Sequence, residues 1–356
     1  MRTKSIIIAG AGCTLSDANN KPLRSRPPLD KGFFQDCNRA GHGELRIVKD
    51  YLRRTYDFDP TNSNQDRLES VMAIIYADIH NPQLVGDAGE AFRALIRLFN
   101  RRIAVTTNDL KPTNRFNLYR ILCRMIDNGL SPEEICIITF NQDIQIEKIL
   151  QKLQSTRRTK RCGIIFSFPF CYKLPNSSGR VTGPRGNIPT FQLGDPSNPG
   201  VRILKLHGSL NWYSVHHSKQ VPKNAILSSA RRFHIIARSE LTPGLTYTGK
   251  RKQYTFPLVI PPVTHKAGIL HDDLQPVWAE AATTLTKARE IVVFGYSCPA
   301  NDFESANLIR RTVRQNSDLE EFSIIDPDPT IFQRYVDLTG LDRLYYFKTP
   351  ESYIQS

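Results

Sequence analysis

Residues 135–143 read ICIITFNQD, a short apolar run followed at once by polar side chains. A continuous apolar run of this length is typical of a parallel strand that is buried on both faces. Residues 142–153 then place apolar side chains at the i, i+3, i+4 and i+7 spacing of a helix: Ile146, Ile149, Leu150 and Leu153. The stretch therefore predicts a strand, a turn that carries Asn141 and Asp143, and a helix.

Four more segments are predicted to be strands, and each is followed by glycine or a polar residue. Residues 5–9 precede Gly10-Ala11-Gly12, 201–206 precede His207, 291–294 precede Gly295-Tyr296-Ser297, and 322–325 precede Asp326. Helical periodicity is found at 66–79, 88–101, 114–127, 274–288 and 302–314. This alternation predicts an α/β fold: a Rossmann-like, mostly parallel sheet with helices on both faces and a smaller inserted helical and loop lobe.

A chain of 356 residues is long for one domain and short for three. We expect a single unit over 1–356 with inserted lobes near 40–130, 156–200 and 221–262. Residues 156–200 are basic and then rich in Pro, Ser, Gly and Asn, and 221–262 are irregular with short β-like pieces. Residues 15–43 are expected to form a long loop, because Pro, Asp, Asn and Gly dominate them.

The composition is that of a globular protein, with 40% hydrophobic and 23% charged residues. No apolar run reaches the ~18 residues of a membrane span, and the N-terminal apolar stretch is too short for a signal peptide, so we expect a cytoplasmic protein without membrane contact. The net charge of +14 favours an acidic partner or a polyanion. The basic clusters at 157–161, 231–232, 250–252 and 310–311 are dispersed, which favours a solvated surface or a protein interface and leaves direct nucleic-acid binding open.

The seven cysteines are scattered, odd in number and without a C-x-x-C pair. A disulfide framework is therefore not expected in a cytosolic chain. A metal could be collected by Cys162, Cys171, His216 and His217, but their spacing does not match a zinc knuckle. We expect no metal site.

The residues that could bind a ligand or take part in a reaction lie at the strand ends, because ligands of open α/β sheets bind at the carboxyl ends of strands. The Gly10-Ala11-Gly12 turn suits close approach to a pyrophosphate, or is simply a tight strand exit. Gly295 and Ser297 repeat this design on a later strand. Asp326 can accept both hydroxyls of a ribose, or can start the turn Asp-Pro-Asp-Pro.

Asn141, Asp143 and His207 are the candidate reactive groups. The amide of Asn141 can orient a water or a sugar hydroxyl, although Asn141 is also a natural N-cap for the helix that follows. Asp143 can accept a hydrogen bond from a carboxamide, and Thr139 can support the turn. His207 can take a proton from a hydroxyl or a water near neutral pH, or can be a satisfied structural histidine.

Taken in order, the motifs GAG, T-x-N-x-D, L-H-G, G-Y-S and a strand ending in D-P resemble the sirtuin family, and especially its bacterial sirtuin-like branch in anti-phage defence. They span residues 10–326, and FGYSCPANDFESANLI at 294–309 is particularly similar to that branch. The resemblance implies that NAD is bound as a substrate. It makes Asn141 and His207 the catalytic pair, and Asp143 the group that holds the nicotinamide carboxamide. The implied cofactor-binding residues are Gly10, Ala11, Gly12, Cys13, Thr139, Gly295, Ser297 and Asp326.

The chain departs from deacylating sirtuins in three places, one of which is Phe140, where that family has a Gln before the Asn. Those enzymes carry a four-cysteine zinc module and a Gly-Ile-Pro-Asp-Phe-Arg loop after GAG, whereas residues 13–34 here read CTLSDANNKPLRSRPPLDKGFF. These differences favour an NAD glycohydrolase that releases nicotinamide and ADP-ribose, without zinc, as an NAD-depleting defence effector. The resemblance implies control by assembly, as a homo-oligomer or with a HerA-type hexameric ATPase. The alternatives are an NAD-dependent protein deacylase or ADP-ribosyltransferase, and a non-catalytic nucleotide-sensing subunit.

Overall fold

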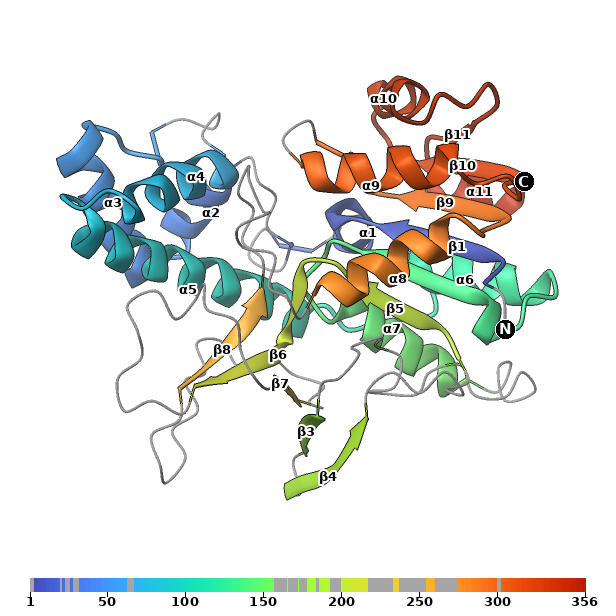
Figure 1. Cartoon of the computed structure of the whole chain (residues 1–356), viewed down its shortest axis with the longest axis horizontal. Coiled ribbons are helices and arrows are strands. Elements are labelled where there is room, and N and C mark those ends of the chain that lie inside the picture. Colours follow the sequence, from blue (N-terminus) through green and yellow to red (C-terminus); the bar gives the residue numbers. More distant parts are fainter. Residues whose placement is uncertain are drawn as a thin grey trace.

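Six parallel strands form the central sheet of the computed structural model (Figure 1). They are β1 (Ser5–Ala9), β2 (Ile135–Thr139), β5 (Arg202–Lys205), β9 (Glu290–Phe294), β10 (Glu321–Ile325) and β11 (Tyr345–Phe347). The structure describes residues 3–19, 21–22, 26–27, 32–62, 67–156, 165, 172, 178–183, 186–192, 200–216, 233–236, 254–259, 274–299 and 302–356.

The sheet lies between two layers of helices, which confirms the predicted Rossmann-like α/β class. On one side α7 (Gln145–Gln154) packs on α6 (Asn117–Asp127), which packs on α11 (Pro350–Gln355). On the other side α8 (Gln275–Leu285) packs on α9 (Phe303–Arg314), which packs on α10 (Thr330–Thr339). All five residues of both β1 and β2 are buried, as strands covered on both faces must be.

The strand order places a crevice beside β1. The sheet runs β11-β10-β9-β1-β2-β5. Counted in chain order, that is 6-5-4-1-2-3, the order of doubly wound dinucleotide-binding sheets read from one edge. The chain builds outward from β1 in one direction and then, from β9, in the other. The carboxyl ends of β1 and β9 therefore flank the switch point where such sheets bind ligands.

A helical lobe follows the short helix α1 (Ala11–Ser16) and lies to one side of the sheet in Figure 1. It comprises α2 (Phe33–Arg39), α3 (Gly43–Tyr56), α4 (Leu68–Ile79) and α5 (Val85–Asp109). The prediction of a loop over 15–43 is wrong where α2 forms. That helix is too short to show a period in the sequence. Burial of Phe33, Phe34 and Cys37 against the lobe stabilises it instead.

The other inserted segments share a second sheet. Its order is β4-β3-β7-β6-β8, formed by β3 (Ser178–Gly183), β4 (Gly186–Gln192), β6 (Gly208–His216), β7 (Phe233–Ile236) and β8 (Tyr254–Val259). Strands from 156–200 and from 221–262 thus meet in one unit. The basic clusters at 157–161, 231–232 and 250–252, together with Cys162, Cys171 and His217, lie outside the described residues.

Two glycine turns touch each other at the switch point. The Gly12 N–H donates to the carbonyl oxygen of Gly295 over 2.9 Å. A Cβ atom at Gly10 would lie 2.4 Å from that same oxygen, and a Cβ at Gly295 would lie 2.2 Å from the backbone nitrogen of Cys13. Gly295 also has φ +61°, in the left-handed region. Only glycine on both turns allows this approach.

None of the helices in the described residues is long and apolar enough to cross a membrane.

Gly295→Ala should destabilise the fold strongly, because the added methyl meets backbone atoms that cannot move aside. We expect the free energy of unfolding to fall by about 3 kcal/mol or more, measured by urea denaturation. The matched control is Gly129→Ala, which has φ +91° and no atom within 4 Å of the new Cβ. It should lose only about 1 kcal/mol. Equal losses in the two variants would contradict the packing argument.

Candidate active site at the switch point of the sheet

A pocket of about 880 Å³ lies at the carboxyl ends of the central strands. Its volume is within the range of small-molecule and cofactor sites. Nine of the side chains and turns singled out in the sequence line it: Gly10, Ala11, Gly12, Asn141, Asp143, His207, Gly295, Ser297 and Asp326. Cys13 and Thr139 do not line the pocket and lie buried behind it. Burial raises the pKa of the Cys13 thiol well above its usual range, which keeps the thiol neutral.

Asn141 is fixed by the β1 exit rather than by a helix. Its Nδ2 donates to the carbonyl oxygen of Gly10 over 2.9 Å and to Thr14 Oγ1 over 3.4 Å, and its backbone N–H donates to Thr139 Oγ1 over 3.0 Å. The helix-cap interpretation of Asn141 is wrong, because α7 begins at Gln145. The two side-chain contacts use the amide hydrogens, so the carbonyl oxygen of Asn141 remains as an acceptor in the pocket wall.

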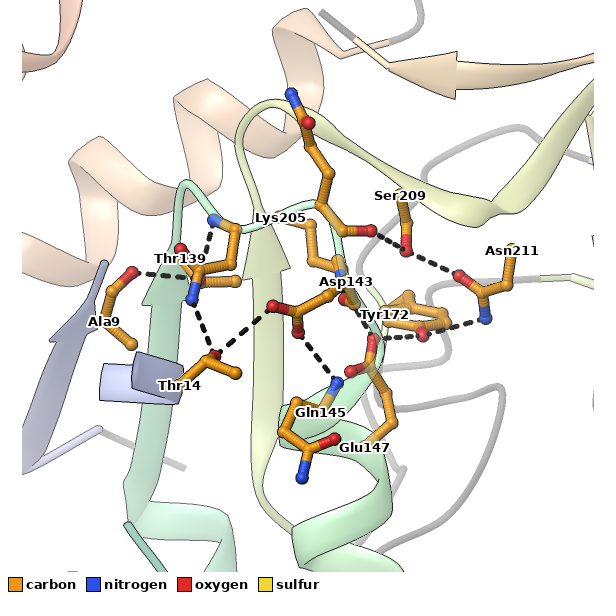
Figure 2. A network of polar contacts seen from close by, with 12 residues as sticks. Ala9, Thr14, Thr139, Asp143, Gln145, Glu147, Tyr172, Lys205, Ser209 and Asn211 are labelled. Atoms are coloured by element: carbon orange, nitrogen blue, oxygen red, sulfur yellow. Dashed lines mark hydrogen bonds and ion pairs between the residues drawn. The ribbon is translucent and has the colours of Figure 1, made fainter. Parts of the chain in front are cut away.

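Asp143 is a buried carboxylate at the start of α7. Its Oδ1 accepts from the Gln145 N–H over 2.8 Å, and its Oδ2 accepts from Thr14 Oγ1 over 3.3 Å, as Figure 2 shows. Burial raises the pKa of Asp143 above its usual range, while the cation of Lys205 and the Gln145 hydrogen bond act in the opposite direction. Through the contact of Oδ1, it is Asp143, and not Asn141, that accepts from the backbone N–H of Gln145, the first residue of α7.

His207 lies in an aromatic corner of the pocket. Its ring centroid is 5.2 Å from that of Phe140 and 6.3 Å from that of Trp278. Phe140 stacks on Tyr296, with ring centroids 4.1 Å apart. Trp278 Nε1 donates to the carbonyl oxygen of Leu206 over 2.9 Å, next to His207 in the chain. The imidazole is thus packed on apolar rings, which hold its orientation and shield it from bulk water.

Phe140 and Tyr296 were given no role from the sequence. Phe140 directly follows the predicted strand at 135–139, and Tyr296 lies two residues after the one at 291–294, so a position near a strand end is the sequence signal for both. The Tyr296 hydroxyl donates to Asp302 Oδ2 over 2.8 Å, and the Tyr335 hydroxyl donates to the Tyr296 carbonyl oxygen over 3.0 Å. These bonds fix the β9 exit, so the Phe140–Tyr296 stack is a rigid part of the pocket wall.

The far end of the pocket is formed at β9 and β10. The N–H of Gly12 is used by Gly295, as described above, so this amide is not free for a phosphate. Asp326 Oδ1 accepts from the Asp328 N–H over 3.0 Å, which confirms the turn interpretation for one carboxylate oxygen. Burial raises the pKa of Asp326 above its usual range. The Ser297 carbonyl oxygen accepts from Arg334 over 2.7 Å, so that loop is held from α10.

Two further segments line the pocket that the sequence does not predict to be near it. The helical lobe contributes Leu68, Glu69, Phe99 and Ile103, and the segment after β11 contributes Lys348, Thr349, Pro350 and Glu351. Nothing in the local sequence links these residues to the strand ends. The lobe residues reach the pocket because the lobe docks against the crevice, and the others because they follow β11, the edge strand beside β10.

Asp17 lies beside the pocket, between Ser16 and the start of α6. Its Oδ1 accepts from the Asn117 N–H over 2.7 Å, and its buried Oδ2 has no hydrogen-bond partner among the described residues. Burial raises the pKa of Asp17 to about 7, with the nearby Glu351 adding to the rise and Arg120 opposing it. The protonated carboxyl is the form that suits this environment.

Metal ligands are not gathered anywhere in the described part of the chain, where no three His, Cys, Asp or Glu side chains form a group that could hold an ion. None of the five cysteines in that part forms a disulfide. The absence of zinc stays a prediction, because Cys162 and Cys171 lie outside the described residues.

No family model and no curated protein matches the chain. Among solved structures, it is similar to a crystal structure of Sir2 in complex with the inhibitor EX-527, 2'-O-acetyl-ADP-ribose and a deacetylated p53 peptide. That match has 11% identity and a TM-score of 0.37, and covers 99% of this chain and 91% of the other. A second, from work on the mechanism and regulation of Sir2 enzymes, has 12% identity and a TM-score of 0.38, with 99% and 90% covered. At these values the fold class stands on the strand order alone.

Asp17→Asn should stabilise the protein at alkaline pH. The folded-state pKa of about 7 lies above the ordinary 3.8, so folding favours the protonated carboxyl. That stability is fully present below about pH 4 and is lost as the pH rises through about 7. The variant should melt at a higher temperature than wild type at pH 8 and at an equal one near pH 4. Asp337→Asn, which removes an exposed carboxylate, is the control and should show no such crossover.

Proposed function

We propose that the chain cleaves NAD at the bond between nicotinamide and ribose. One observation carries the proposal: Asn141 and Asp143 from the β2 exit and His207 from the β5 exit line the same pocket that reaches the glycine turns of the switch point. One amide, one carboxylate and one imidazole thus come together at one end of a crevice of the kind that binds dinucleotides.

The dimensions of the pocket suit a dinucleotide. In sheet order, its lining passes from His207 after β5 to Asn141 after β2, Gly10 after β1, Gly295 after β9 and Asp326 after β10. Four steps between strands at ~4.8 Å each span about 19 Å. That length accommodates two nucleosides joined by a pyrophosphate, with the nicotinamide end at His207 and the adenosine end at Asp326.

The residues present fit distinct parts of NAD. The Asp143 carboxylate would accept from the carboxamide, and the carbonyl oxygen of Asn141 would accept from a ribose hydroxyl or a water. Gly10, Gly295 and Ser297 would face the phosphates and the inner ribose. The second carboxylate oxygen of Asp326 would take a hydroxyl of the adenosine ribose, since the first one holds the turn.

Cleavage of the nicotinamide–ribose bond requires little covalent catalysis by the protein, because nicotinamide leaves NAD as a neutral molecule from a cationic linkage. The site must orient the base, exclude bulk water and supply one positioned nucleophile. The Phe140–Tyr296 stack and the lobe residues exclude water, and Asn141 positions the nucleophile. His207 accepts the proton that the nucleophile or the ribose hydroxyl releases.

The biological setting is proposed from the motif resemblance. It supports an NAD-depleting anti-phage effector acting in the cytoplasm, held in check by assembly as a homo-oligomer or with a HerA-type hexameric ATPase. The net charge of +14 is compatible with an acidic partner surface. Zinc has no part in the proposed reaction.

Purified protein, alone and together with the product of the neighbouring gene, should release nicotinamide from NAD, measured by liquid chromatography. Asn141→Ala and His207→Ala should each lower the rate at least about 100-fold, because each removes a group that acts on the nucleophile or its proton. The controls are Asn114→Ala and His80→Ala, which alter exposed residues of the same types and should keep the wild-type rate.

The alternatives give different results in the same assay. Release of nicotinamide only when an acylated peptide or an acceptor protein is added would identify a deacylase or an ADP-ribosyltransferase. Binding of NAD without turnover in every mixture would identify a nucleotide-sensing subunit. No release in any mixture, with the site variants indistinguishable from wild type in cells, would refute the proposed reaction.

A further inference from the structure

A fully buried lysine lies beneath the candidate site. Lys205 is the last residue of β5, paired in register with Thr139 of β2, and its side chain is 0% exposed. A charge in the interior is unfavourable unless it is paired and fully hydrogen-bonded. Lys205 lies on the strand next to the one that leads into the turn with Asn141 and Asp143. The groups that it contacts there must compensate for the burial of its charge.

The charge of Lys205 is balanced by a polar network. Its Nζ lies 2.9 Å from Glu147 Oε1 in the first turn of α7, and the Tyr172 hydroxyl donates to the same oxygen over 2.6 Å. Asn211 Nδ2 donates to the Tyr172 hydroxyl over 3.3 Å, and Ser209 Oγ donates to Asn211 Oδ1 over 2.6 Å. Figure 2 shows that β5, β6, α7 and Tyr172 all contribute to this network.

The network holds the backbone of the catalytic turn. Lys205 Nζ also donates to the carbonyl oxygen of Asp143 (Figure 2). The neighbouring carbonyl oxygen, that of Gln142, accepts from the Leu210 N–H over 2.9 Å and lies 3.5 Å from Ser209 Oγ. Two consecutive peptide groups are thus fixed from the end of β5 and the start of β6. The orientation of the Asp143 side chain depends on these peptides.

We propose that Lys205 is a positioning residue for the NAD-cleaving reaction: it holds the carbonyl oxygen of Asp143 and so aims the Asp143 carboxylate into the pocket. This inference rests on the proposed function. Lys205 is not one of the residues that line the pocket and acts only through the turn.

The electrostatics favour the same role. Burial disfavours the ionised form of Asp143, Glu147 adds a like charge, and the Lys205 cation is the largest influence that lowers the Asp143 pKa. The lysine therefore supports both the position and the ionised state of the carboxylate.

The experiment separates positioning from mere stability. Lys205→Met leaves Glu147 buried and unpaired, so this variant alone is expected to melt at a lower temperature. In the double variant Lys205→Met/Glu147→Gln, both partners are neutral and the new amide oxygen can still accept from Tyr172, so most of the melting temperature should return. The donor to the Asp143 carbonyl remains absent. Lys152→Met, which alters an exposed lysine of α7, is the matched control.

Two readouts apply to the double variant. Hydrogen exchange of residues 140–147 without NAD should be faster than in wild type, while that of α6 and β9 is unchanged. The kcat/KM for nicotinamide release should fall about 100-fold through kcat, because a small displacement of a catalytic group has an effect of that size. Lys205→Gln, which keeps an N–H donor without the charge, is the second variant and should give intermediate values in both measurements.

Wild-type exchange in the turn of the stably folded double variant would overturn the proposal, and so would faster exchange with an unchanged rate of NAD cleavage. Return of both stability and activity in the double variant would make Lys205 a structural residue only. If wild-type protein cleaves no NAD, the proposed function fails. The exchange measurement then decides independently whether Lys205 fixes the turn.

Discussion

The contact between the β1 and β9 exits is the constraint on which the rest of the structure depends. The two turns approach until the Gly12 N–H meets the Gly295 carbonyl oxygen, and any side chain at Gly10 or Gly295 would overlap backbone atoms. This contact brings the two halves of the doubly wound sheet together at the switch point. The pocket forms directly above it, so the glycines set the floor on which every other group of the site is arranged.

The second level of organisation is the turn after β2, which is anchored on all sides. The β1 exit holds its Asn141 side chain, α7 and Thr14 hold the Asp143 carboxylate, and Lys205 holds the peptide below. Buried polar groups of this kind are stabilised by such hydrogen bonds. The same hydrogen bonds that satisfy the turn also preorganise it, which is what the proposed reaction requires.

The parts of the protein that could be predicted from the sequence are those whose signals are local. The runs before Gly10, Asn141, Gly295 and Asp326 are mostly apolar and carry no charge, so the strands and the side chains at their ends could be predicted. The α2 helix escaped prediction because tertiary packing stabilises it. Glu69 of the helical lobe reaches the pocket through docking across a long sequence separation, and nothing in the sequence of β5, RILK, shows that Lys205 is buried.

The aromatic corner around His207 has a practical consequence. The chain has two tryptophans. Trp278 lies beside His207 at one end of the pocket, whereas Trp212 packs against Tyr172. Replacing Trp212 with phenylalanine would leave a single tryptophan, whose fluorescence would report events at the imidazole without any added label.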